Sequence, residues 1–368
     1  MTKPSPITYS EAGVDTEKEE AGLQGLLRWL NKTLSFPLKD GIGLPLEDIG
    51  LFANVIDIGR GNGLALSTDG VGTKIIVAQM MNKYDTIGID LVAMNVNDVL
   101  CVGARPISMI DYIAVQEPNP QLLEEIGRGL YQGAKIANIT IVGGEIAQLR
   151  EMIKAEKENF GFDLAGMCVG ICSIKKIING QNVEEGDVVI GIESSGIHSN
   201  GFTLARKTFF DQLFKVDDYS EELNKTFGEE LITPTHIYVS EILELLDSGI
   251  NIKALVHITS DGFLNLLRVK SPAGYIIDYL PDIPPVFSLI QKLGKISDAH
   301  MFEVYNMGIG FCVIIPEKEA ENVLSIVEKH NKKGYKIGYV VSDKKMQRKV
   351  KIEPRGLIGE GGKFNKIG

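Results

Sequence analysis

Apolar positions in the first half of the chain recur with periods that predict both helices and strands. Leu23, Leu26, Leu27 and Leu30 lie three or four residues apart, which predicts a helix over 19–34. Farther on, short apolar runs that end in turn residues predict strands, and longer runs predict helices. The strands are expected at 63–68, 106–115, 139–145 and 163–174, and the helices at 90–102, closed by Gly103, and at 120–138.

A polar stretch at 175–187 separates these elements from a second set. There we expect strands at 187–194, 308–315 and 336–341, and helices that start at 202 and span 234–248 and 317–332. Both halves therefore mix strands and helices in an α/β or α+β manner. Residues 1–8 are expected to be a flexible arm, and 36–63 to be irregular, because Gly, Pro and Asp are frequent there.

The length of the chain predicts more than one domain, because 368 residues exceed a comfortable single core. We place the N-terminal domain at 1–174 and the C-terminal domain at 183–345. The basic residues of 346–368 are expected to form a tail that extends over the surface.

Charge and cysteine content narrow the classes of partner. The net charge of -10 argues against a broad surface for nucleic acid or acidic lipid, although Mg²⁺ can still bridge an acidic site to a nucleotide. The four cysteines form no CxxC pair and lie in apolar stretches, which favours free thiols in a reducing cytosol. No apolar run reaches transmembrane length, and the N-terminus has no hydrophobic signal core. We therefore expect a cytoplasmic protein with no membrane or nucleic-acid partner.

Three isolated carboxylates lie at ends of predicted elements in the first half. Asp69 follows a strand, Asp98 lies in the last turns of a helix, and Glu145 follows a glycine pair. Each alone is typical of a solvated turn, and Asp69-Gly70 is also typical of a tight hairpin. Together they make a divalent-metal cluster possible, because Mg²⁺ prefers carboxylate and phosphate oxygens.

The predicted helix at 90–102 has an unusual polar face. Asp90 and Asp98 are eight residues apart and share that face with Met94, while Asn97 is adjacent to it. A face of this kind suits a helix that borders a cleft. For Asp90 alone, a cap on the helix N-terminus is the simpler interpretation.

A loop of small residues at 194–202 lies between a predicted strand and a predicted helix. Its backbone N–H groups and the helix N-terminus suit an anion, and His198 suits a phosphate; a plain strand-to-helix turn capped by Ser or Asn fits equally well. The spacing of a Walker A motif is absent, as are a dinucleotide fingerprint, a serine-hydrolase elbow and a zinc-binding pair of histidines.

The motifs taken in chain order resemble the phosphoribosylformylglycinamidine cyclo-ligase family, also called aminoimidazole ribonucleotide synthetases. They are YSEAGVD (9–15), TDGVGTK (68–74), DLVAMNVNDVLCVGARP (90–106), GGE (143–145), DLAGMCVGI (163–171), SSGIHSNGF (194–202), PTHIYV (234–239) and NMGIG (306–310). The resemblance runs from residue 9 to about residue 341. Its D-x-x-x-x-G-A-x-P element, 98–106, belongs to a wider ATP-binding superfamily.

The resemblance implies two α/β domains, with N-terminal sheets that pair across a homodimer and a C-terminal α/β sandwich. It implies ATP-dependent closure of an imidazole ring on a small ribonucleotide, with ATP and Mg²⁺ as cofactors. By motif match the metal carboxylates are Asp69, Asp98 and Glu145. The residues implied at the nucleotide or substrate phosphates are Gly70, Val71, Gly72, Thr73, Asn97, Asp98, Gly144, Glu145, Ser195, Ser199 and Asn200. Asp69, Lys74 and His198 are implied in catalysis.

Several positions depart from the family pattern. Ser10-Glu11 stand where many members have a lysine, Asp261 stands where only glycines are usual, and Glu303 and His236 replace arginines. These changes lie on the substrate side, and several add negative charge. Two alternatives therefore stay open: a divergent superfamily enzyme that phosphorylates another small substrate, and a non-catalytic dimer that binds nucleotide.

Overall fold

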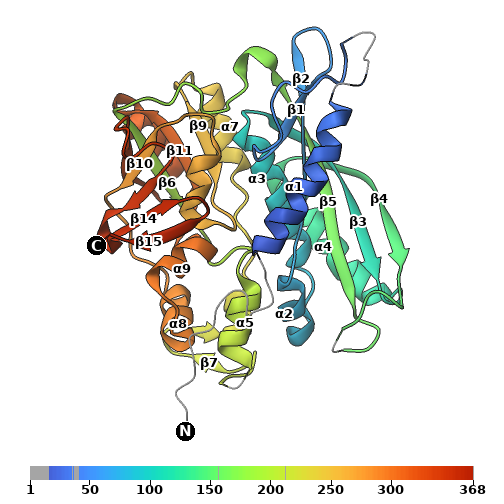
Figure 1. The fold of residues 1–368 in the computed structure, drawn as a ribbon. Helices are drawn as coiled ribbons and strands as arrows, with labels where there is room; N and C mark the ends of the chain where they lie inside the picture. The colour runs from blue at the N-terminus through green and yellow to red at the C-terminus, as the bar shows by residue number, and fades with distance from the viewer. Residues whose placement is uncertain (1–15, 35, 37–40, 156, 212, 368) are drawn as a thin grey trace.

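The computed structural model describes residues 16–34, 36, 41–155, 157–211 and 213–367. The expected arm at 1–8 and the motif at 9–15, with its Ser10-Glu11 departure, lie outside the described residues. Figure 1 shows two lobes, each built of a sheet with helices. The expected two-domain α/β architecture is thus confirmed.

The N-terminal lobe contains a five-stranded sheet in the order β1-β2-β5-β3-β4. The strands are β1 (Asn54–Asp57), β2 (Asn62–Gly70), β3 (Arg105–Val115), β4 (Thr140–Gln148) and β5 (Phe162–Ser173). Four of them match the expected strands. The fifth, β1, lies in the stretch expected to be irregular, because four residues are too few to show a period.

The Asp69-Gly70 pair is not a hairpin turn. β2 stays paired with β5 as far as Gly70, and helix α2 (Lys74–Met81) begins four residues later. The chain therefore turns from a strand into a helix over residues 71–73. Gly72 has the φ of +69° that such a turn needs.

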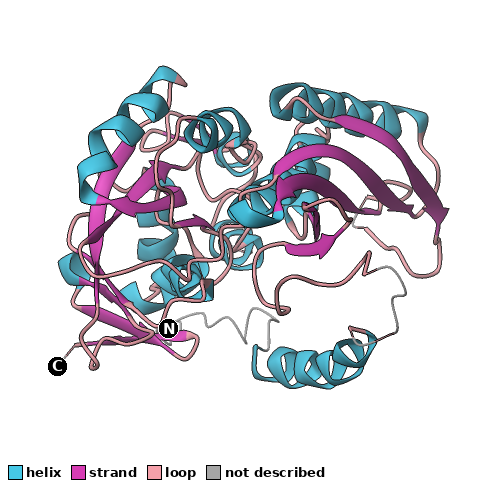
Figure 2. Ribbon diagram, turned by 90° about the horizontal axis from the view of Figure 1, so that it is seen from above, coloured by secondary structure: helices cyan, strands magenta, loops and turns pink. Residues whose placement is uncertain are grey.

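Helices cover one face of this sheet (Figure 2). α3 (Ile87–Cys101) packs on it beside α4 (Pro120–Ala137), and Gly88 allows the close contact, because a Cβ there would lie 2.2 Å from the Leu130 nitrogen. α3 starts three residues before the expected Asp90, and Gly103 follows its end with φ of +74°, as expected. The other face turns toward α1 (Thr16–Thr33), which stands apart from it (Figure 2).

The C-terminal lobe contains an eight-stranded sheet in the order β15-β14-β13-β10-β12-β6-β11-β9. Its strands are β6 (Asp187–Glu193), β9 (Ala254–His257), β10 (Gly274–Ile277), β11 (Ile309–Pro316), β12 (Gly334–Val341), β13 (Val350–Ile352), β14 (Leu357–Glu360) and β15 (Lys363–Lys366). A separate two-stranded ribbon joins β7 (Tyr219–Ser220) to β8 (Lys225–Thr226).

The basic stretch at 346–368 was expected to be a surface tail, and this is wrong for its described part. β13, β14 and β15 extend the sheet, and Val350, Leu357 and Phe364 are buried. Phe364 packs against Phe302, with ring centroids 6.4 Å apart. The lysines between these apolar positions hide their alternation in the sequence.

Six α-helices accompany this sheet in the described part of the chain. They are α5 (Phe202–Phe210), α6 (Phe227–Leu231), α7 (Val239–Asp247), α8 (Pro285–Gly294), α9 (Asp298–Val304) and α10 (Ala320–Lys329). α7 begins five residues after the expected start at 234. Residues 234–238 instead run along the junction of the two lobes, where they form part of the site described below.

The junction is broad and centres on α3, which contacts the N-terminal sheet on one side and α7 and β9 on the other. Burial between two lobes explains why this helix carries polar residues on more than one side. Arg268 also ties the lobes together, since its guanidinium donates to the Gly50 and Leu51 carbonyls and lies over the Phe52 ring. Within the described residues, no helix combines the length and apolar character needed to cross a bilayer.

Candidate active site

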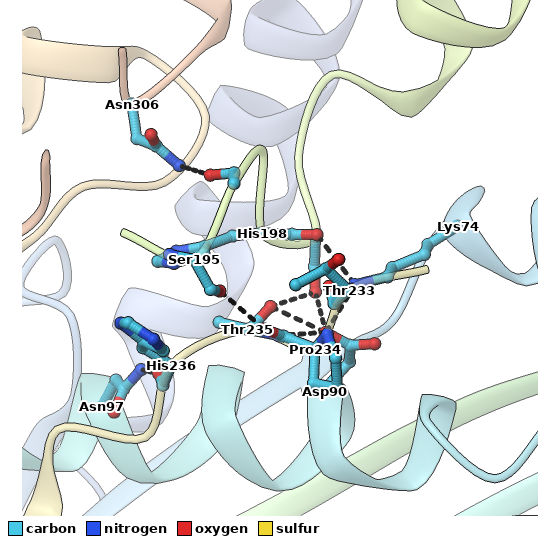
Figure 3. A network of polar contacts seen from close by, with 12 residues as sticks. Lys74, Asp90, Asn97, Ser195, His198, Thr233, Pro234, Thr235, His236 and Asn306 are labelled. Atoms are coloured by element: carbon cyan, nitrogen blue, oxygen red, sulfur yellow. Dashed lines mark hydrogen bonds and ion pairs between the residues drawn. The ribbon is translucent and has the colours of Figure 1, made fainter. Parts of the chain in front are cut away.

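Most of the residues singled out in the sequence meet at the junction of the lobes. They come from the end of β2, from α3, from the loop after β6 and from the segment before α7. Figure 3 shows side chains of α2, α3, the loop after β6 and the segment before α7 converging there. Glu145 and Gly144 are the exceptions, because they lie on the edge strand β4.

Asp69 lies half-buried where β2 ends. Its N–H donates to Asn95 Oδ1 at 3.1 Å, and its own Oδ1 accepts the Gly70 N–H at 2.8 Å. Burial, and after it the nearby Asp98 carboxylate, raise the pKa of Asp69 to about 6, against the lowering effect of that hydrogen bond. The two carboxylates are therefore close enough to repel each other, as two ligands of one cation would be.

Asp98 is held by a histidine of the other lobe. Its Oδ1 lies 2.9 Å from His257 Nδ1, and the His257 ring is fully buried. Sequence reasoning missed His257 as a site residue. Its only signal was its position four residues before Asp261, in the stretch HITSDGF (257–263).

Asn97, next to Asp98 on α3, binds the backbone of the opposite lobe. Its Oδ1 accepts the Tyr238 N–H at 3.0 Å, and its Nδ2 donates to the His236 carbonyl at 2.8 Å. Both groups of the amide are therefore engaged by the segment before α7. α3 therefore has the expected polar face, and this face contacts the C-terminal lobe.

Glu145 is far from the other two carboxylates in the same chain. The register aligns Asp69 with Gly166, Gly166 with Asp111, and Asp111 with Gly144, so β4 lies three strands from β2. At strand spacing this is roughly 14 Å. Among the described residues no three acidic, histidine or cysteine side chains lie close enough to hold a metal ion.

Glu145 also lies on the other face of the sheet. It pairs with Tyr112 of β3, which is the residue after Asp111. Because neighbouring residues of a strand face opposite sides of the sheet, Glu145 and Tyr112 face away from the side that Asp69 and Asp111 share. The face with Tyr112 is the one that no neighbouring helix covers, and both side chains are exposed. One chain therefore does not assemble the expected carboxylate set.

Asp111 is a carboxylate that sequence reasoning did not select. It is half-buried on β3, where it aligns with Asp69 through Gly166 of β5 and faces the same side of the sheet. Burial raises the pKa of Asp111. A Cβ on Gly144 would lie 2.4 Å from Asp111 Oδ1, so the glycine before Glu145 is needed to accommodate this side chain. Asp111 lies inside a strand that was predicted from its apolar residues, so nothing in the local sequence indicated that it belongs to a functional site.

Lys74 lies inside the junction, away from any open surface. Its side chain is fully buried, and its Nζ donates to Asp90 Oδ1 at 2.8 Å, to the Thr233 carbonyl at 2.6 Å and to the His198 carbonyl at 3.1 Å (Figure 3). Asp90 is equally buried. The N-cap expected of Asp90 is wrong, because Thr86 occupies that position of α3.

The loop after β6 is tied to both lobes. Ser195 Oγ donates to the Pro234 carbonyl at 2.6 Å, and Ser199 Oγ donates to Asp90 Oδ1 at 3.3 Å. The Ser195 N–H donates to His198 Nε2 at 3.2 Å, which leaves the proton of this ring on Nδ1. Burial holds the pKa of His198 well below its usual range, so the ring is neutral. Asn200 is half-buried at the end of this loop, just before α5.

The turn between β2 and α2 presents backbone to solvent. Gly72 and Thr73 are exposed, whereas Val71 is buried and its N–H donates to the Leu164 carbonyl. Thr73 Oγ1 lies 3.1 Å from Thr203 Oγ1 at the start of α5. The two segments expected at phosphates thus meet across the junction.

The departures from the family pattern have different structural roles. Asp261 is exposed and takes a φ of +73°, a left-handed conformation that glycine adopts readily and Asp tolerates. His236 is half-buried, with its Nδ1 3.3 Å from the Glu193 carbonyl. Burial lowers the pKa of His236, so this position carries little of the positive charge that an arginine would supply.

Glu303 anchors the C-terminal hairpin. Its Oε1 accepts the Phe364 N–H at 2.7 Å, and its Oε2 lies 3.1 Å from His300 Nδ1. The added negative charge is therefore engaged by the protein itself.

Replacing Glu303 should loosen this hairpin. Glu303→Gln weakens a charge-assisted hydrogen bond, and we expect a loss of about 1–2 kcal/mol in unfolding free energy. Thermal unfolding should show a drop of a few degrees. Glu328→Gln, at an exposed position of α10, is the control and should leave the midpoint unchanged. Equal midpoints for the two variants would contradict the anchoring role.

Comparisons with known proteins agree on one family. The sequence model of the AIR synthase related protein N-terminal domain matches residues 51–172, and that of its C-terminal domain matches residues 184–351. A phosphoribosylformylglycinamidine cyclo-ligase of Methanocaldococcus jannaschii is 47% identical over 91% of this chain and 92% of its own. One of Methanobrevibacter smithii is 46% identical over 94% and 97%.

Solved structures share the fold at low sequence identity. Thiamine-monophosphate kinase of Stenotrophomonas maltophilia has a TM-score of 0.61 at 17% identity, and covers 89% of this chain and 94% of its own. A structure titled AaThiL, complexed with AMPPCP and TMP, has a TM-score of 0.62 at 13% identity and covers 92% and 96%. These likenesses concern the fold alone.

Proposed function

The chain belongs to the AIR synthase related protein family, and from this we propose that it is an ATP-dependent cyclo-ligase of purine biosynthesis. The substrate is formylglycinamidine ribonucleotide, and the products are aminoimidazole ribonucleotide, ADP and phosphate. The observation that carries the proposal is the identity of nearly half of all positions with curated cyclo-ligases over almost the full length of both chains.

The reaction joins two steps on one substrate. The γ-phosphoryl group of ATP is transferred to the formyl amide oxygen, which turns that oxygen into part of a good leaving group. The amidine nitrogen then attacks the activated carbon, and the oxygen leaves as phosphate while the ring closes. The protein's main contributions are to position the two substrates and to neutralise charge.

We propose that Asp69 and Asp98 hold Mg²⁺ together with ATP phosphates. Their mutual repulsion and the burial that raises the Asp69 pKa fit a pair arranged for a cation. Mg²⁺ is commonly bound by one or two carboxylates plus phosphates and water, so two carboxylates suffice. When bound, Mg²⁺ neutralises the charge that develops on the transferred phosphoryl group.

We propose that phosphates are bound by the turn from Gly70 to Thr73, in which Gly72 and Thr73 are exposed, and by the loop that leads into α5. The residues of that loop are Ser195, Ser199 and Asn200, which are half-buried. Asn97 shapes the site through its two bonds to the segment before α7. The neutral His198 ring fixes the Ser195 N–H, and so orients this loop.

We propose that the active form is a homodimer that pairs the uncovered faces of two N-terminal sheets. Ile110, Tyr112 and Ile171 lie on that face and are exposed, and contiguous apolar surface of this kind favours a protein interface. Glu145 shares the face, so a second copy could bring it to the site of Asp69 and Asp98.

A reducing compartment suits the cysteines. Cys101, Cys168, Cys172 and Cys312 are free thiols, and three of them are buried. We therefore propose a cytoplasmic location, as expected from the sequence.

An assay with authentic formylglycinamidine ribonucleotide tests the function. The purified chain with ATP and Mg²⁺ should release ADP and a diazotisable aminoimidazole in equal amounts, and omission of either substrate should stop both. ATP consumption without the aminoimidazole would overturn the proposal. A panel of other small phosphoryl acceptors would then test for a divergent superfamily enzyme.

A further inference from the structure

We propose that Lys74 and Asp90 form a buried ion pair that positions two loops of the C-terminal lobe for ring closure, and that Lys74 acts there and does not bind phosphate. The inference rests on the proposed cyclo-ligase activity for its kinetic test. It assigns a positioning role to a lysine whose motif pointed to catalysis.

All donors of Lys74 are used by protein oxygens. An ammonium group has three N–H donors, and the structure gives its Nζ three acceptors: Asp90 Oδ1 and the carbonyls of Thr233 and His198. The side chain has no exposed surface. A phosphate contact would require the amine to leave all three partners and the buried position.

Asp90 completes the pair from the other side. Besides Lys74, its Oδ1 accepts the Thr235 N–H at 2.8 Å, the Thr235 hydroxyl at 2.7 Å and the Ser199 hydroxyl at 3.3 Å. Its Oδ2 is buried without a hydrogen-bond partner. The carboxylate therefore depends on Lys74 for charge compensation.

The pair comes from one lobe, and its other partners come from the second lobe. Lys74 begins α2 and Asp90 lies in the first turn of α3. The loop after β6 supplies His198 and Ser199, and the segment before α7 supplies Thr233 and Thr235. The loop after β6 also carries Ser195, Ser199 and Asn200, which are proposed at phosphate, and Ser195 links it to the segment before α7 through the Pro234 carbonyl.

Physical chemistry makes such a pair a strong positional constraint. Loss of one member of a buried ion pair leaves an uncompensated charge, whereas loss of both can be nearly neutral. Relaxation around that charge would displace both loops that bond to the pair, whereas the double variant loses the hydrogen bonds of Lys74 but keeps no uncompensated buried charge. A displacement of about 1 Å at a reacting group can cost on the order of 10²-fold in rate.

A double-mutant cycle separates positioning from phosphate binding. Steady-state kinetics with ATP and the ribonucleotide would compare Lys74→Met, Asp90→Asn and the double variant with the unchanged chain. We expect each single change to lower kcat/KM on the order of 10²-fold, and the double variant to be no worse than the better single one. Direct phosphate binding by Lys74 predicts a raised KM for ATP in Lys74→Met, little effect of Asp90→Asn, and no recovery in the double variant; that result would overturn the proposal.

Hydrogen exchange gives a readout that does not depend on activity. Amides of 195–201 and 233–238 should exchange faster in each single variant, and return toward the original rates in the double variant. Unchanged exchange in both segments would overturn the proposal even if activity fell. If the unchanged chain made no product, the proposed function would fail, while the exchange cycle would still decide the positioning role.

Two further variants protect the test against simple misfolding. Thr235→Val keeps the side-chain shape and leaves Lys74 intact, but removes one donor to Asp90; we expect roughly 10-fold lower kcat/KM and faster exchange in 233–238. Activity equal to the unchanged chain would argue against positioning through Asp90.

Lys253→Met is the matched control, because this buried amine is paired with Glu184 and Asp187 within the C-terminal lobe, away from the junction. It should leave exchange in both loops unchanged.

Discussion

Asp69→Asn should abolish Mg²⁺-dependent turnover while leaving the fold intact. The amide keeps the shape of the side chain but removes one of the two carboxylates proposed to hold Mg²⁺ with ATP. We expect a loss of at least about 10³-fold in kcat, because charge stabilisation on the transferred phosphoryl group depends on that ion. Coupled release of ADP and aminoimidazole measures it.

The effect on stability should have the opposite sign. The pKa of Asp69 is raised to about 6, so the folded state disfavours its charged form, and ionisation at neutral pH costs stability. Asparagine removes that cost together with the repulsion from Asp98. The unfolding midpoint at neutral pH should therefore stay the same or rise, which is common where function requires strained charge.

A matched control exists on the neighbouring strand. Asp57 is also half-buried at a strand end, and its Oδ1 accepts a backbone N–H from Gly59 at 2.7 Å. Asp57→Asn should leave kcat within a few-fold of the unchanged chain. If Asp69→Asn also stays within a few-fold, Asp69 is not a ligand of the metal.

Two inactive variants should restore each other when mixed. Asp69→Asn and Glu145→Gln are each expected to be inactive alone. If Glu145 reaches the site of a second copy, a dimer with one chain of each kind has one site with both changes and one with neither. Random pairing then returns about a quarter of the original activity, because about half of the dimers are mixed and each has one intact site.

Co-expression with two different tags, followed by purification through both, isolates the mixed dimer for this measurement. Its activity should be compared with that of a mixed dimer of Asp69→Asn and Asp98→Asn, in which each of the two sites carries one change, so that no site is intact and activity should not recover. A mixed dimer with no recovered activity would show that Glu145 does not act across the interface. A monomeric molar mass in light scattering would contradict the proposed homodimer.

The family and most of the core strands of the N-terminal lobe could be predicted from the sequence. The motifs around Asp69 and Asp98 are contiguous and specific, and β2, β3, β4 and β5 have apolar runs long enough to read. The short strands β9, β10 and β13 to β15 could not be read in this way. Each has only three or four residues, so the pattern cannot show a period, and their stability comes from neighbours in the sheet.

Local sequence gave no sign of the partners of three charged residues. Asp90 was interpreted as a helix cap, Lys74 was implied in catalysis by its motif, and Glu303 was placed on the substrate side. In the structure each is engaged by groups far away in the chain: Asp90 by Thr235, Lys74 by Thr233 and Glu303 by Phe364. The partner of a charge decides its role, and distant partners leave no trace in local spacing.

By itself the sequence determined the family, the reaction class and the two-lobe α/β organisation, and it singled out Asp69 and Asp98 as candidate metal ligands, because the motifs that indicate each of these consist of contiguous residues. Only the tertiary structure decided that Glu145 lies three strands from Asp69 on the opposite face, and that Lys74 is locked between the lobes. Strand order and the meeting of two lobes are set by packing over the whole chain, which no short stretch of residues encodes.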